Sequence, residues 1–101
     1  MSGAITAERL AEALARLPGW RVEAGTLRRS YRFPSFGEAV RFMHACIEAI
    51  DQADHHPEWS NTYNRVEVRL STHDEGGIIT AKDVALAKIL EWQAGLWGVI
   101  G

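Results

Sequence analysis

The sequence has few of the features that mark specialised protein classes. A single cysteine, Cys46, excludes an internal disulfide framework and a metal site built from several cysteines. No apolar run approaches the roughly 18–20 residues of a membrane span, and the net charge of −2 gives no electrostatic case for a nucleic-acid or membrane partner. Residues 1–4 lack the basic and apolar layout of a secretory signal, so we expect a cytoplasmic protein.

The composition fits one soluble globular domain. Hydrophobic residues make up 47% of the 101 residues and charged residues 24%, as in ordinary soluble proteins. This length supports one core but not two, so we expect a single domain over residues 1–101. Cys46 lies within an apolar helical pattern, which predicts a packing role.

The order of elements predicts an α+β fold. Thr6, the Ser35–Glu38 pair and the Thr80–Asp83 pair are typical helix starts. We expect helices at residues 6–17, from 35 to about 55 and 80–93, and strands at residues 20–23, 27–33, 59–63 and 66–73. The order α-β-β-α-β-β-α predicts a four-stranded antiparallel sheet of two hairpins, with three helices on one face and the other face free.

The second and third helices carry many apolar residues. In the second helix we expect one core-facing stripe, made of Phe36, Val40, Met43, Ile47 and Ile50. In the third helix the apolar residues spread around most of the circumference: Val84, Leu86, Ile89, Leu90 and Trp92. One small core cannot easily bury all of these side chains, which favours a partner surface and a homo-oligomer.

The segment Asp54-His55-His56-Pro57-Glu58-Trp59 is the best candidate for chemistry. Pro57 disfavours helical geometry in the residue before it, so His56 should leave the helix while His55 stays in its last turn. Two imidazoles would then point in different directions. The unperturbed pKa of histidine, roughly 6.5, suits proton transfer near neutral pH. The alternative is a polar helix end with solvated histidines.

His73, at the end of the last strand, adds a third imidazole, whereas His44 is interpreted as a surface residue. Three imidazoles with acidic neighbours could bind a metal such as zinc or act as general acid and base. Adjacent histidines rarely face one ion, and no serine or cysteine is paired with a base. The residues alone therefore favour a histidine acid–base site over a metal site, and we expect no metal and no cofactor.

Several spaced elements together resemble the pterin-4a-carbinolamine dehydratases, a family that also includes the dimerisation cofactor of a homeodomain transcription factor. The resemblance covers roughly residues 5 to 96 and extends to Gly19-Trp20 and Leu70-Ser71-Thr72-His73. It departs from the family in having Asp51 where glutamate is usual, and in a 73–83 loop one residue longer than in animal members. The matching motif is Asp51, His55-His56-Pro57, Tyr63, His73 and Asp83.

The resemblance implies dehydration of 4a-hydroxytetrahydrobiopterin, or a related tetrahydropterin, to the quinonoid dihydropterin and water, in tetrahydrobiopterin recycling. It implies that His55 and His73 act as acid and base and that His56 orients the pterin. The expected substrate-binding residues are Asp51, Trp59, Tyr63 and Asp83.

The same residues have structural explanations. Asp83 fits a helix cap, Asp51 an exposed helix position, and Trp59 and Tyr63 sheet packing. The alternative function is a non-catalytic oligomeric module that stabilises a transcription regulator or a pterin-dependent aromatic amino acid hydroxylase. Self-association as a homodimer or homotetramer is expected in either case.

Overall fold

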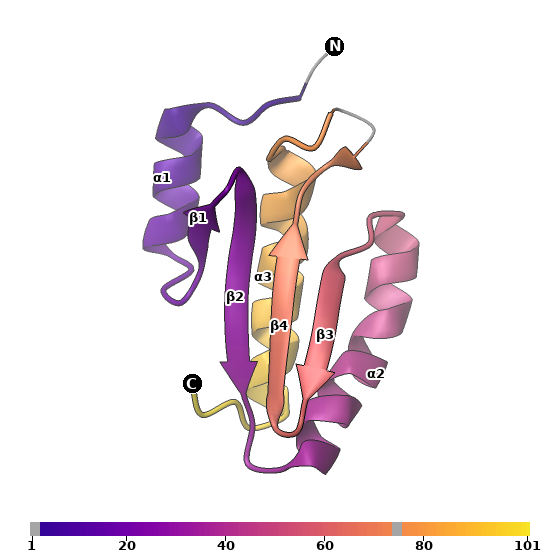
Figure 1. The fold of residues 1–101 in the computed structure, drawn as a ribbon. Coiled ribbons are helices and arrows are strands. Elements are labelled where there is room, and N and C mark those ends of the chain that lie inside the picture. The colour runs from indigo at the N-terminus through magenta and orange to yellow at the C-terminus, as the bar shows by residue number, and fades with distance from the viewer. Residues whose placement is uncertain (1–2, 74–75) are drawn as a thin grey trace.

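The elements follow the predicted order along the chain (Figure 1). The computed structural model describes residues 3–73 and 76–101. The helices are α1 (Ala7–Ala15), α2 (Phe36–Ala53) and α3 (Ala81–Leu96). The strands are β1 (Arg21–Glu23), β2 (Thr26–Arg32), β3 (Glu58–Thr62) and β4 (Arg65–Leu70).

Side chains just before the helices cap their first turns, as predicted. The Thr6 hydroxyl accepts a hydrogen bond from the Arg9 N–H (3.2 Å), and the Ser35 hydroxyl accepts one from the Glu38 N–H (3.3 Å). Thr80 and Asp83 form a reciprocal capping box at the start of α3. These caps place Asp83 in the first turn of α3.

The sheet is antiparallel with the strand order β1-β2-β4-β3, and the helices cover one face of it. In Figure 1, α3 runs behind β2 and β4, and α2 runs beside β3. A groove is lined by residues of both α1 and α3, which puts α1 on the same side as α3. The predicted α+β architecture is confirmed.

The core lies between the sheet and the helices. Alternating residues of β4, namely Val66, Val68 and Leu70, are buried, while Glu67 and Arg69 are exposed on the other face. Phe42 of α2 packs against the rings of Tyr31 and Phe33, at centroid distances of 5.2 and 4.9 Å. The face of β4 that the helices leave open therefore carries its polar residues.

The predicted core stripe of α2 is wrong in part. Ile50 is buried and Met43 half-buried, but Phe36, Val40 and Ile47 are exposed. The residues of α2 that enter the core are Ala39, Phe42, Cys46 and Ile50. The helix has two apolar stripes, and Phe42 selects the buried one because it meets Tyr31 and Phe33.

The third helix buries more than expected. Val84, Leu86 and Leu90 are buried in the core, while Trp92 and Leu96 remain 66% and 61% exposed. The exposed apolar surface predicted for this helix therefore lies near its carboxyl end. Within the described residues, no helix is long and apolar enough to cross a membrane.

Candidate active site

The corner between α2 and β3 is formed by a helix end that comes earlier than predicted. α2 ends at Ala53, and Asp54 caps it in the left-handed conformation (φ 50°), with its N–H bonded to the Asp51 carbonyl. His55 therefore lies outside the helix, and the prediction that it belongs to the last turn is wrong. Left-handed backbone is tolerated by aspartate better than by most residues, which explains the early stop.

The two histidines of the corner enter different environments. His55 is 9% exposed and His56 is exposed. Their ring nitrogens contact different carboxylates, Asp83 of α3 and Asp51 of α2. The expectation that the two rings point in different directions agrees with this geometry.

His55 forms the buried contact of the corner. Its Nε2 lies 2.6 Å from Oδ1 of Asp83, whose side chain is fully buried. A carboxylate can only accept, so this short contact makes Nε2 the donor. Asp83 thus fixes both the ring orientation and the position of the hydrogen, which leaves Nδ1 as the other functional nitrogen.

Asp83 also holds the segment that follows β4. Its Oδ2 accepts hydrogen bonds from the Thr72 hydroxyl and from the Thr80 N–H, both at 2.9 Å. Thr72 Oγ1 and Thr80 Oγ1 lie 2.7 Å apart. One buried carboxylate therefore joins the His55 corner, the start of α3 and the residue before His73.

His73 follows this network directly. It is exposed, and it comes after the end of β4 at Leu70, so it does not share a strand face with Glu67 and Arg69 as predicted. Its carbonyl accepts the Gly76 N–H at 3.0 Å. The predicted loop residues Asp74 and Glu75 lie outside the described residues. The exposed ring of His73 is thus carried by a backbone that Thr72 anchors to Asp83.

The His56–Asp51 contact lies at the surface. His56 Nε2 and Asp51 Oδ1 are 3.0 Å apart, and the side chains are 61% and 67% exposed. Asp51 is in the last turn of α2. Solvent competes for both groups, so this pair can exchange partners at low cost.

The two aromatic candidates lie at different ends of β3. Trp59 is half-buried beside the corner, and its ring meets Phe42 edge-on at 6.4 Å. Tyr63 is 69% exposed in the β3–β4 turn, about 16 Å along the strand from Glu58. Within one chain Tyr63 does not join the histidine corner, and its role as a pterin contact stays a prediction.

Sequence reasoning missed Thr72 as a site residue. Its position continues the core-facing alternation of β4, and a hydroxyl in such a position needs a buried partner. That rule, applied together with the nearby capping aspartate, would have indicated the Thr72–Asp83 hydrogen bond.

Two further observations concern the reactive side chains of the chain. Burial raises the pKa of the Cys46 thiol to about 12, which keeps it protonated and inert as a nucleophile. Among the side chains of residues 3–73 and 76–101, no group of three or more histidine, cysteine, aspartate or glutamate residues is arranged to hold a metal ion.

Comparisons with known proteins agree on one family. The family model described as pterin 4 alpha carbinolamine dehydratase matches residues 3–92. A protein of Opitutus terrae, provisionally named pterin-4-alpha-carbinolamine dehydratase, is 47% identical over 86% of this chain and 90% of its own length. A protein of Afipia carboxidovorans with the same provisional name is 48% identical over 86% of this chain and 88% of its own length.

A solved structure agrees with the sequence comparisons. The crystal structure of a transcriptional coactivator/pterin dehydratase from Brucella melitensis superposes with a TM-score of 0.84 at 39% identity, over 91% of this chain and 99% of that one. The chain therefore belongs to the pterin-4a-carbinolamine dehydratase family, which makes it a dehydratase by class.

Proposed function

We propose that this protein dehydrates 4a-hydroxytetrahydrobiopterin, or a related 4a-hydroxytetrahydropterin, to the quinonoid dihydropterin and water, in tetrahydrobiopterin recycling. The observation that carries the proposal is the placement of Asp83. This buried carboxylate holds the ring of His55 and, through Thr72, the backbone that leads into His73.

The reaction needs two proton transfers. The 4a-hydroxyl must gain a proton as it leaves as water, and a ring nitrogen must lose one. Two positioned imidazoles can serve as acid and base near neutral pH, and each such group typically contributes about 10²–10⁴-fold to the rate. The proposal gives these two roles to His55 and His73.

The remaining corner residues would hold the pterin. His56 is exposed and only loosely held by Asp51, so its ring is available to bind or orient the substrate. Trp59 offers a half-buried aromatic edge next to the corner. Asp83 is a positioning residue here, because its oxygens face His55, Thr72 and Thr80.

The test follows the disappearance of chemically generated 4a-hydroxytetrahydropterin by ultraviolet absorbance. His55→Ala and His73→Ala should each lower the enzymatic rate by about 10²–10⁴-fold. His44→Ala is the matched control, because His44 is exposed on α2, away from the corner. Wild-type protein that does not exceed the spontaneous rate, with its fold verified by circular dichroism, would refute the proposal.

A second candidate function is association with a partner or with further copies of the chain. Phe36, Val40 and Ile47 are spaced along one side of α2 and are 52%, 39% and 48% exposed, which supports a homodimer or homotetramer. If this protein is a non-catalytic module, its partner would be a pterin-dependent aromatic amino acid hydroxylase or a transcription regulator. Gel filtration of Ile47→Asp should give a smaller species than wild type, and an unchanged elution volume would contradict self-association through α2.

A further inference from the structure

Three arginines form a row across the open face of the sheet. Arg21 of β1 is directly opposite Arg28 of β2, and Arg28 is directly opposite Arg69 of β4. Neighbouring strands lie about 4.8 Å apart, so the three arginine positions follow one another at that spacing. Glu58 of β3 is directly opposite Arg69 at the far end of the same row. We call the three arginines the arginine row.

Such a row costs stability unless something neutralises it. Like charges directly opposite one another on a sheet are destabilising. Arg21 forms an ion pair with Glu23 (2.9 Å), and Arg28 donates through Nε to the Thr26 hydroxyl (2.8 Å). Within residues 3–73 and 76–101, no carboxylate forms an ion pair with Arg28 or Arg69.

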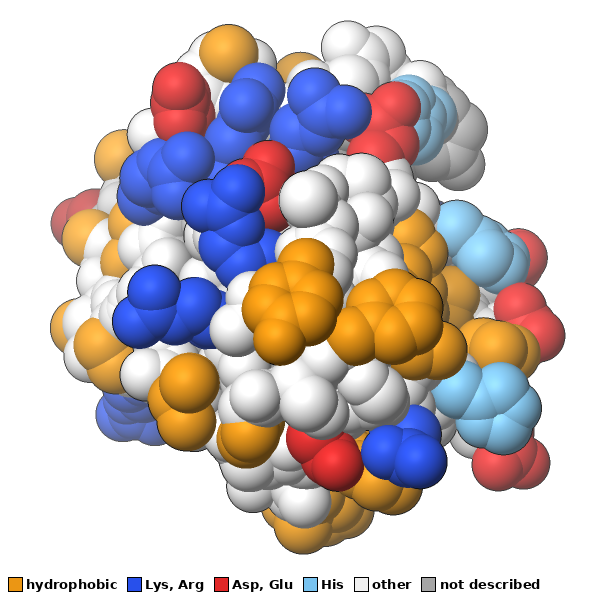
Figure 2. Space-filling model, turned by 60° about the horizontal axis from the view of Figure 1, so that its bottom comes forward, with side chains coloured by type: hydrophobic (Ala, Val, Ile, Leu, Met, Phe, Trp, Pro, Cys, Tyr) orange, Lys and Arg blue, Asp and Glu red, His pale blue; other side chains and the backbone are white. Residues whose placement is uncertain are grey.

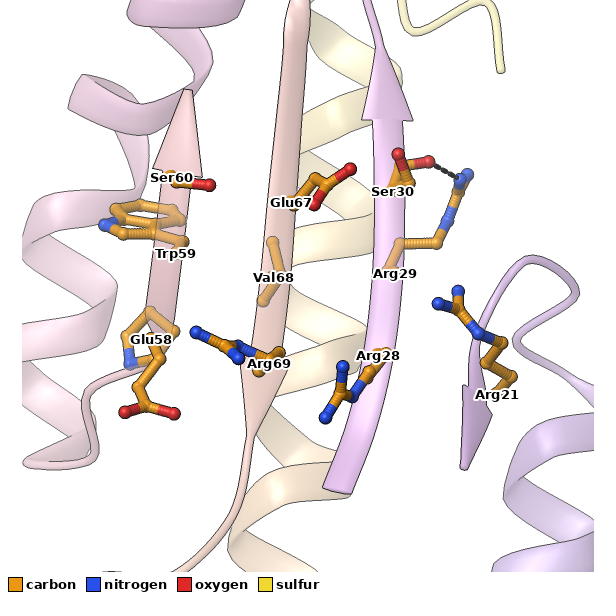
Figure 3. Close-up of a pocket in the computed structure, with 11 residues that line it drawn as sticks. Arg21, Arg28, Arg29, Ser30, Glu58, Trp59, Ser60, Glu67, Val68 and Arg69 are labelled. Carbon is orange, nitrogen blue, oxygen red and sulfur yellow. Dashed lines mark hydrogen bonds between the residues drawn. The ribbon is translucent and has the colours of Figure 1, made fainter. Parts of the chain in front are cut away.

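The arginine row borders a hollow of about 550 Å³ on this face. Figure 3 shows the three guanidinium groups along one end of it. The next row on the same face runs from Ser30 through Glu67 to Ser60 and supplies two hydroxyls. Figure 2 shows basic side chains gathered in one band with acidic ones beside them. A volume of this size suits a small molecule.

The chemistry of the hollow identifies the kind of ligand. Guanidinium groups bind phosphate oxygens through paired hydrogen bonds, and hydroxyls can add further donors. Glu58 and Glu67 also line the hollow, and they would repel a long polyanion but accept hydrogen bonds from hydroxyl or amino groups of a compact ligand. The ring of Trp59 meets Phe42 of α2 on the helix-covered side, so it is not a stacking platform for a single-stranded nucleic acid.

We propose that this hollow binds a small molecule carrying a diphosphate or two phosphate groups. The ligand's oxygens neutralise Arg28 and Arg69, and its donors face the two glutamates. The site is separate from the His55–Asp83 contact, since Asp83 belongs to α3 and the arginine row lies on the face that the helices leave open. The proposal does not depend on the dehydratase activity.

The test titrates the protein with pyrophosphate and, separately, with orthophosphate by isothermal calorimetry at constant ionic strength. Wild type should bind one pyrophosphate in a saturable manner and more tightly than orthophosphate. Arg28→Gln and Arg69→Gln should each weaken pyrophosphate binding about tenfold or more, because each removes a charge-assisted hydrogen-bonding group.

Arg65→Gln is the matched control. Arg65 is exposed on β4 and also lies opposite an arginine, Arg32 of β2, but it does not line the hollow. Its variant should bind pyrophosphate like wild type. Equal weakening in Arg65→Gln and Arg69→Gln would show general charge attraction and overturn the proposal. Absence of saturable binding to the wild type would also overturn it, as would tighter binding of oligothymidylate that grows with its length.

Thermal unfolding without ligand separates lost binding from lost folding. Arg28→Gln removes one of three adjacent like charges, so its midpoint should equal or exceed that of wild type. Added pyrophosphate should raise the midpoint of wild type and leave that of Arg28→Gln unchanged. Pyrophosphate that raises the midpoint of Arg28→Gln as much as that of wild type would overturn the proposal.

Discussion

The two histidines of the corner make the same type of contact in contrasting surroundings. His55 meets Asp83 at 2.6 Å with side chains 10% and 0% exposed, whereas His56 meets Asp51 at 3.0 Å with side chains 61% and 67% exposed. An exposed pair contributes only about 0–1 kcal/mol, because water solvates both groups well when they separate. In the buried pair, loss of Asp83 leaves the His55 Nε2 donor without its acceptor in a place that water reaches poorly.

This difference in burial suits the two neighbouring histidines to different roles. His55 is held in one orientation by a carboxylate that also accepts hydrogen bonds from two other groups, the Thr72 hydroxyl and the Thr80 N–H. His56 keeps the freedom to leave Asp51 for another partner. A fixed imidazole suits proton transfer at a defined atom, and a free one suits recognition of a substrate that comes and goes.

Removing Asp83 should cause the largest loss of stability among the variants that test this comparison. Asp83→Ala should lower the free energy of unfolding by about 3–5 kcal/mol, because it leaves His55, Thr72 and the Thr80 N–H without their buried acceptor. Urea denaturation monitored by tryptophan fluorescence gives the value. Asp51→Ala is the matched control and should change stability by no more than about 0.5 kcal/mol. Similar losses in both variants would contradict the distinction.

Removing one donor to Asp83 should have an intermediate effect. Thr72→Val keeps the shape of the side chain but deletes the hydroxyl, which should cost about 1–3 kcal/mol of stability. The dehydration rate should also fall, since Thr72 anchors the backbone that carries His73. Thr62→Val on the exposed edge of β3 is the control for the threonine-to-valine change itself. A Thr72→Val protein as stable and active as this control would show that the Thr72–Asp83 bond is incidental.

Much of the fold follows from local signals in the sequence. Caps at Thr6, Ser35 and Thr80 fixed the helix starts, and alternation in residues 66–70 identified the two faces of β4. The choice between the two apolar stripes of α2 could not be predicted, because it depends on where Tyr31 and Phe33 place their rings. The end of α2 was misplaced because Asp54 adopts left-handed backbone, which the motif does not reveal.

The residues of the candidate site could be predicted from the sequence, but the histidine–carboxylate pairs that they form could not. The motif named His55, His56, Asp51 and Asp83. The pairing of His55 with Asp83 joins residues 28 positions apart and depends on how α3 packs against the sheet. Local periodicity holds no information about that packing.

The smallest expected effect concerns the coupling between His56 and Asp51. A double-mutant cycle with His56→Ala, Asp51→Ala and the combined variant should give a coupling energy of at most about 1 kcal/mol. That coupling should shrink further when salt is raised from 0.05 to about 1 M, since the Debye length falls to about 3 Å. The same cycle on His55 and Asp83 should give a larger coupling that salt barely changes, because both side chains are buried. Equal couplings with equal salt dependence would mean that burial does not separate the two histidines, and the assignment of a fixed and a free imidazole would fail.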